Sequence, residues 1–171
     1  MIIKGKGFTL IEILIYIAVL AVIISAVISF FLWSVSSQRK EKAAREVLNS
    51  ATRAMELITF ETRAAKSIYT PNTTSTQLSL ETRRYLSPQE FTSFLDFFLC
   101  KKQICFKREF QNPISITSNF VEIDKIEFIP VLKGSMESVS VVIEASYKNP
   151  SNKPELEASV RLSSVVALRS Y

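Results

Sequence analysis

The chain has 171 residues, a formal net charge of +5 and no histidine, and its only aspartates are Asp96 and Asp124. Imidazole-based catalysis, most zinc sites and an acidic calcium loop are therefore not expected. The three glycines, Gly5, Gly7 and Gly134, cannot build a glycine-rich phosphate loop. We expect neither an enzyme nor a bound metal or cofactor.

The N-terminal part of the chain predicts a helix that can cross a membrane. Ile13 to Trp33 is a run of 21 residues without a charge, which gives about 31 Å of helix at 1.5 Å per residue. A secretory signal peptide has a shorter apolar core, of about 7–15 residues, and is cut after that core. Basic residues flank the run on both sides, so charge alone does not set its orientation.

A single carboxylate, Glu12, lies at the start of this apolar helix, and the next charged residue is Arg39. A charge at the centre of a bilayer costs about 2.5–3.5 kcal/mol on insertion scales, so an ionisable residue in such a segment is interpreted as functional. The helix macrodipole would also favour a carboxylate near the N-terminus. Taken as a lone residue, Glu12 leaves both interpretations open.

The residues that lead up to Glu12 form a recognisable motif. Residues 7–12, GFTLIE, resemble the G|FTLIE processing site in precursors of the type IV pilin and pseudopilin superfamily. The resemblance implies that a prepilin peptidase cuts after Gly7 and that the new amine of Phe8 is methylated. It further implies that Glu12 faces the amine of Phe8 in a neighbouring subunit. Such a head-to-tail contact builds an open filament.

The same resemblance implies partners and a location. Residues 1–7 would be a leader whose charges, Lys4 and Lys6, are removed with it, which lowers the net charge from +5 to +3. The implied partners are the prepilin peptidase, other pilin or pseudopilin subunits through the N-terminal helix, an inner-membrane assembly platform and the lipid bilayer. The N-terminus would be cytoplasmic, with the head outside the cytoplasmic membrane and later in a periplasmic or surface filament.

The helix is expected to continue beyond the membrane, because residues 8–70 contain neither glycine nor proline and Pro71 is the first strong stop. We predict a transmembrane half at residues 8–35 and an amphipathic half at residues 36–70. A free coiled-coil stalk is the alternative for the second half, although its apolar stripe is wider than a strict coiled-coil seam. The predicted stripe consists of Val47, Leu48, Ala51, Ala54, Met55, Ile58, Ala65 and Ile68.

Residues 71–171 are predicted to form an extracytoplasmic, β-rich head. Apolar and polar residues alternate there, as in half-buried antiparallel strands. The expected strands lie at residues 78–82, 94–99, 105–110, 121–129, 139–147 and 156–162, with a turn at residues 133–135. The fold class is thus α+β, one long helix packed on an antiparallel sheet in a pilin-like lollipop. The strand succession also resembles the heads of minor pilins and J-type minor pseudopilins.

The two cysteines lie on either side of an expected hairpin turn. If Lys102 and Gln103 form a two-residue turn, Cys100 and Cys105 are a directly opposed, closely spaced pair. Their sulfurs are then within bridging range, and a disulfide is favoured outside the cytoplasm. Two buried thiols are the alternative.

The leading functional prediction is a minor pilin or minor pseudopilin, since the anchor lacks the glycine and proline found in many major pilins. One alternative is a pilus subunit that binds DNA or a surface, with Tyr85 and Phe106 as stacking groups. Its phosphate contacts would come from Arg83, Arg84, Lys101, Lys102, Lys107 and Arg108. Charges this dispersed are typical of a solvated surface, so nucleic acid is not the expected partner.

Another alternative is an unprocessed single-pass membrane protein with a binding head. Asn72 also begins a glycosylation sequon, a triplet that often occurs by chance.

Overall fold

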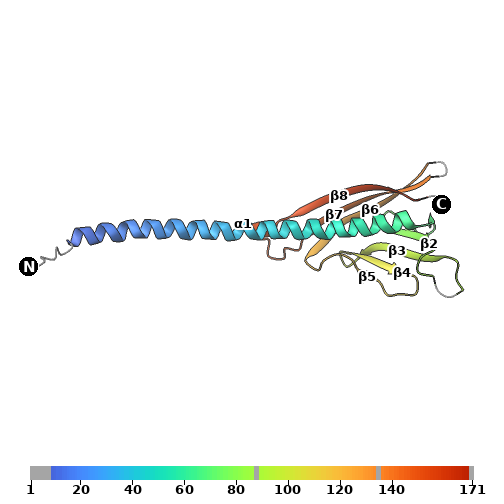
Figure 1. The fold of residues 1–171 in the computed structure, drawn as a ribbon, viewed down its shortest axis with the longest axis horizontal. Helices are drawn as coiled ribbons and strands as arrows, with labels where there is room; N and C mark the ends of the chain where they lie inside the picture. The colour runs from blue at the N-terminus through green and yellow to red at the C-terminus, as the bar shows by residue number, and fades with distance from the viewer. Residues whose placement is uncertain (1–8, 87–88, 134–135, 170–171) are drawn as a thin grey trace, which may run out of the picture. The chain divides into compact units, whose positions relative to one another are not determined.

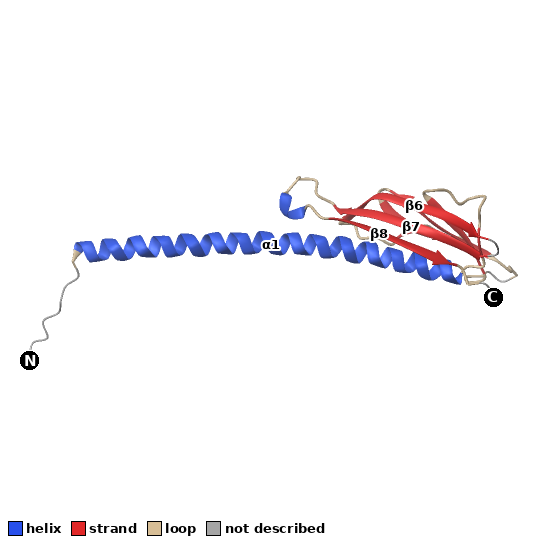
Figure 2. Cartoon of the chain, turned by 90° about the horizontal axis from the view of Figure 1, so that it is seen from above, coloured by secondary structure: helices blue, strands red, loops and turns tan. Residues whose placement is uncertain are grey.

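The computed structural model describes residues 9–86, 89–133 and 136–169. Within these ranges the chain forms one long helix, eight strands and a short 3-10 helix (Figures 1 and 2). The predicted α+β class, with a long N-terminal helix packed on antiparallel strands, is confirmed. In chain order the elements are α1 (Leu10–Ala64), β1 (Ser67–Ile68), β2 (Gln77–Thr82), β3 (Ser93–Cys100), β4 (Gln103–Arg108), β5 (Ile114–Ser115), β6 (Val121–Lys133), β7 (Met136–Tyr147), η1 (Pro154–Leu156) and β8 (Ser159–Ala167).

The chain divides into two compact units, one up to Arg39 and one from Lys40 onward. The described part of the first unit consists of Thr9 and the first part of α1. The carbonyl of Thr9 accepts hydrogen bonds from the amides of Glu12 and Ile13, at 3.1 and 3.3 Å, and so begins the helix. The uninterrupted helix follows from a sequence without glycine or proline.

The prediction that this helix continues to residue 70 is wrong, because α1 ends at Ala64. The amide of Lys66 donates to the carbonyl of Glu81 at 2.8 Å. Ser67 and Ile68 then form strand β1, paired with Glu81 and Leu80 of β2. Strand β2 offers these amides a partner outside the helix, so tertiary pairing ends the helix before Pro71 does.

The second unit contains two antiparallel sheets where the sequence predicted one. Their strand orders are β1-β2-β3-β4-β5 and β6-β7-β8. Figure 1 shows the second half of α1 with β6 to β8 on one side and β2 to β5 on the other. Two backbone hydrogen bonds join β6 to loops of the larger sheet, from the amide of Ile123 to the carbonyl of Lys102 at 2.9 Å and from the amide of Phe128 to that of Ser75 at 2.8 Å. The β6 edge of the smaller sheet is therefore in contact with these loops.

The last strand lies later in the chain than predicted. It was expected at residues 156–162, but β8 runs from Ser159 to Ala167, and Leu156 belongs to η1. The alternating side chains suggested the strand, whereas its bounds follow from pairing with β7, from Ser146↔Ser159 to Ser138↔Ala167. In the predicted turn at residues 133–135, Gly134 and Ser135 lie outside the described residues.

The core forms where the apolar stripe of α1 meets both sheets. Five of the six predicted stripe positions within α1 are buried, but Leu48 is 47% exposed; Ala65 and Ile68 are also buried, but they lie beyond the end of the helix. Leu48 follows Val47 by about 100° around the helix and therefore faces away from the sheets. Phe97 of β3 and Phe128 of β6 are at most 1% exposed. Each such burial contributes roughly 1.5–3 kcal/mol.

Truncation of a stripe residue should destabilise the second unit. We expect Ile58→Ala to lower the free energy of unfolding by about 2–5 kcal/mol, because Ile58 is fully buried and the substitution leaves a cavity. Denaturant unfolding of the full chain in detergent micelles, followed by circular dichroism, measures this loss. The matched control is Leu48→Ala on the same helix, which should change stability by less than about 1 kcal/mol. Equal losses for the two variants would contradict the assigned packing.

Candidate functional site

Glu12 lies in the first turn of α1, and its surroundings on the helix are apolar. It is half-buried, whereas Leu10 and Ile11 are 80% and 68% exposed. Its backbone amide is bonded to Thr9, so the first turn is closed and the position of Glu12 on the helix is defined. The carboxylate is the only charged group between Lys6 and Arg39.

The apolar segment that follows Glu12 is long and apolar enough to cross a membrane. Its large side chains, from Leu10 to Trp33, are exposed within the chain and offer an apolar surface. The hydroxyls of Ser25, Ser29 and Ser36 donate to carbonyls three or four residues earlier, at 2.8, 2.8 and 2.9 Å. Such internal bonds satisfy polar groups where water is absent. The segment is therefore compatible with lipid or with other apolar helices.

Four predicted site residues lie outside the described part of the chain. They are Lys4 and Lys6 of the expected leader and the two residues of the expected cleavage site, Gly7 and Phe8. Cleavage, methylation and the pairing of Phe8 with Glu12 therefore stay predictions.

Sequence reasoning missed a buried carboxylate in the second unit. The side chain of Glu61 on α1 is 3% exposed. Its carboxylate accepts a hydrogen bond from the Tyr85 hydroxyl at 2.8 Å and one from Arg84 at 3.4 Å. The guanidinium of Arg108 stacks over the Tyr85 ring, 3.9 Å from the ring centroid. Glu61 follows Ile58 by three residues, so its place on the apolar stripe was the available signal.

The buried carboxylate of Glu61 contributes to a raised pKa of the neighbouring Tyr85. Desolvation raises the pKa of Tyr85 above its ordinary value of 10.0, and the hydrogen bond and negative charge of Glu61 raise it further. Tyr85 also has a backbone φ of 60°, in the left-handed region that is uncommon for residues other than glycine. The contact with Glu61 therefore holds the loop after β2 in an otherwise unfavourable conformation.

The cysteines are joined in a disulfide, but the hairpin differs from the predicted one. Cys100 pairs with Gln103, so the turn residues are Lys101 and Lys102 and not Lys102 and Gln103. Cys105 lies diagonally opposite Cys100, with 5.8 Å between their Cα atoms. Both turn residues have positive φ, 48° and 61°, as in a type I′ turn.

The register of this hairpin is explained by its aromatic residues. The observed pairing places Phe97 opposite Phe106, with ring centroids 5.0 Å apart in the core. In the predicted register Phe97 would have faced Arg108. Burial of two rings against each other therefore outweighs the lack of the usual Asn-Gly turn residues.

The basic residues of the DNA-binding alternative have different surroundings. Phe106 is only 3% exposed, so its predicted role as a base-stacking group is wrong, because the ring belongs to the core. Arg84 is engaged with Glu61, and Lys102 forms an ion pair with Glu122 at 2.9 Å. Arg83, Lys101 and Lys107 are exposed.

The sequon residues lie in the loop between β1 and β2. Asn72 is exposed, and the hydroxyl of Thr74 accepts a hydrogen bond from the amide of Gln77 at 3.1 Å. Among the described residues, no group of three or more His, Cys, Asp or Glu side chains could hold a metal ion.

The interaction between Tyr85 and Glu61 should make stability depend on pH. Because the pKa of Tyr85 is raised on folding, its contribution is fully present below the unfolded pKa of about 10 and is lost as pH rises through the folded pKa. We expect Tyr85→Phe to cost about 1 kcal/mol at neutral pH. Above pH 10 the stabilities of the wild type and the variant should converge. Denaturant unfolding between pH 8 and 11.5 measures the difference, and a constant difference would contradict this assignment.

Comparison with solved structures and with curated proteins gave no significant match. Residues 4–28 match a family described as the prokaryotic N-terminal methylation motif. The match spans the segment that contains Glu12 and most of the apolar run. The motif supports a type IV pilin-like or pseudopilin subunit and points to a structural role rather than to an enzyme. The chain therefore carries the leader signature of type IV pilins and pseudopilins.

Proposed function

We propose that this chain is a minor pilin or minor pseudopilin, a membrane-anchored subunit that joins a type IV pilus or a type II secretion-like filament. The observation that supports this most strongly is one carboxylate, Glu12, in the first turn of a helix that is otherwise uncharged up to Arg39. The methylation motif covers the same residues.

Processing would create the group that pairs with this carboxylate. Cleavage after Gly7 removes residues 1–7 and exposes the amine of Phe8, which is then methylated. An α-amine has a pKa near 7.7–8.0 and is cationic in water. A carboxylate beside it removes two isolated charges from the hydrocarbon, where either charge alone is costly.

The pairing would act between subunits and set their register. Each chain carries both halves, the amine of Phe8 and the carboxylate of Glu12, so successive subunits bind head to tail and the series does not close. The exposed apolar side chains from Leu10 to Trp33 would supply most of the contact area. Before assembly the same surface would lie in the lipid bilayer, with the N-terminus in the cytoplasm and the second unit outside.

The assignment as a minor subunit rests on the continuity of the anchor. α1 is helical without interruption from Leu10 to Ala64, and its sequence has no glycine or proline that would loosen it. Because Glu12 is present, the subunit would accept the usual contact with a neighbour. An inner-membrane assembly platform would extract it into the filament.

The first test is the N-terminus of the chain after expression with a prepilin peptidase. Intact mass and N-terminal sequencing of the membrane-extracted protein should give a chain that begins at N-methylated Phe8. A chain that still begins at Met1 would indicate an unprocessed single-pass membrane protein and would contradict the proposal.

The second test concerns Glu12. We expect Glu12→Ala to be inserted and processed, but to enter filaments at least about tenfold less, because an unpaired buried amine remains. The fraction of the chain in sheared filaments, relative to the membrane fraction of a host with the assembly machinery, measures this. Glu41→Ala, which removes a carboxylate outside the apolar run, is the matched control and should assemble normally. Normal assembly of Glu12→Ala would refute the proposed pairing.

A further inference from the structure

Strand β8 has a free edge. It is the last strand of the sheet β6-β7-β8. Hydrogen bonds at both ends, from Tyr147 to the carbonyl of Ala158 and from the amide of Leu168 to Glu137, show that even-numbered residues bond to β7. By the alternation of an antiparallel ladder, the amides and carbonyls of Arg161, Ser163 and Val165 point away from β7.

Within the described residues, the outward amides and carbonyls of Arg161, Ser163 and Val165 form no backbone hydrogen bond. An unpaired strand edge is a template for pairing with another extended chain. The opposite edge of this sheet differs, because the amides of Ile123 and Phe128 in β6 donate to the carbonyls of Lys102 and Ser75, in loops next to β4 and β2.

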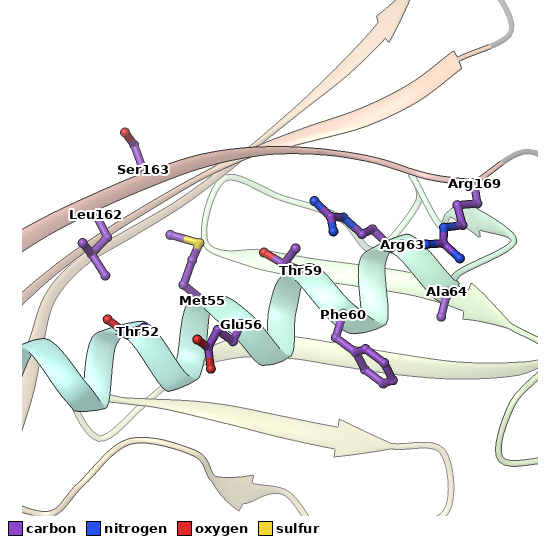
Figure 3. Close-up of a pocket in the computed structure, with 10 residues that line it drawn as sticks. All are labelled: Thr52, Met55, Glu56, Thr59, Phe60, Arg63, Ala64, Leu162, Ser163 and Arg169. Atoms are coloured by element: carbon purple, nitrogen blue, oxygen red, sulfur yellow. The ribbon is translucent and has the colours of Figure 1, made fainter.

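An apolar groove runs beside this edge, between β8 and α1 (Figure 3). Its volume is about 540 Å³, within the usual range of ligand sites. Figure 3 shows Met55 of α1 and Leu162 of β8 pointing toward each other across the groove. The ring of Phe60 points to the other side of α1, where Arg84 stacks over it, so the apolar contacts toward β8 come from Met55 and Leu162 (Figure 3). A strand added to β8 would place alternate side chains over these apolar residues.

Three charged residues line the groove, Glu56, Arg63 and Arg169, so its net charge is +1. Arg63 enters from α1 and Arg169 from the segment after β8, so both side chains reach the same space (Figure 3). Both are exposed, and within the described ranges neither forms an ion pair. Two unpaired guanidinium groups near one end of the β8 edge favour a carboxylate at that position.

We propose that the edge of β8 binds an extended segment of another protein chain by strand addition, with apolar side chains in the groove and an acidic side chain at Arg63 and Arg169. Backbone bonds to Arg161, Ser163 and Val165 would supply affinity, and the groove and arginines would supply specificity. The site is separate from Glu12, so it does not depend on the proposed filament contact.

The test uses the full chain in non-ionic detergent micelles and a phage-displayed library of random 12-residue peptides. Selected peptides should alternate apolar residues and carry Asp or Glu at one position. Synthetic versions with Lys at that position should bind at least about tenfold more weakly. On binding, the amides of Arg161, Ser163 and Val165 should become protected from hydrogen exchange, while that of Val166, already bonded to β7, should change little.

Variants of the chain separate the contribution of backbone pairing from that of the two arginines. Ser163→Pro removes an outward amide and spares the β7 ladder, so it should abolish binding without unfolding the sheet. The double substitution Arg63→Ser with Arg169→Ser should weaken binding of the acidic peptide about tenfold and should change binding of its neutral version little. Lys107→Ser with Lys153→Ser removes the same charge elsewhere and should have no effect.

Three results would overturn the proposal. The first is a selection that enriches no peptide, and the second is enrichment of peptides that Ser163→Pro leaves unaffected. The third is binding of dodecanoate, sensitive to loss of Arg63 and Arg169, without peptide binding, which would assign the groove to an anionic amphiphile. Concentration-dependent dimers abolished by Ser163→Pro would instead identify a second copy as the occupant.

Discussion

The rest of the structure depends on one uninterrupted helix, α1, whose first part is apolar on every side and whose second part packs on the sheets. Its backbone hydrogen bonds are internal, so they are independent of the surrounding medium. From Leu10 to Trp33 the side chains are apolar on every side, apart from Glu12, the hydroxyl of Tyr16 and the self-bonded hydroxyls of Ser25 and Ser29. From Ala43 onward only one stripe is apolar and buried. This change from all-round to one-sided apolarity marks where packing on the sheets begins, and in our proposal the part before it contacts lipid or other helices.

Two carboxylates on this helix illustrate how environment decides the role of a residue type. Glu12 has no cationic partner within the described chain and lies among apolar residues, and in our proposal its partner is the amine of another subunit. Glu61 has its partners inside the chain, Tyr85 and Arg84, and holds Tyr85, whose backbone is left-handed, against α1. One carboxylate thus serves assembly in our proposal, while the other serves the fold. Neither requires catalysis.

Much of the fold was predictable, because its signals are local. Helical spacing identified five buried positions of α1, and alternation located the major strands. The errors arose where distant segments compete for the same backbone groups. Strand β2 recruits residues 67–68 and ends α1 early, and the contact between Phe97 and Phe106 sets a hairpin register that the turn residues do not indicate. Division of the strands into two sheets likewise depends on long-range pairing.

The sequence by itself determined the N-terminal methylation motif, the long apolar segment and the isolation of Glu12, because these depend only on residue types and on their spacing along the chain. Only the tertiary structure decided that Glu61 is buried, that Phe106 belongs to the core and that β8 keeps a free edge beside Arg63 and Arg169. Burial and strand pairing are properties of segments far apart in the chain. A local sequence pattern does not predict which strand edge remains unpaired or which charged side chain becomes buried.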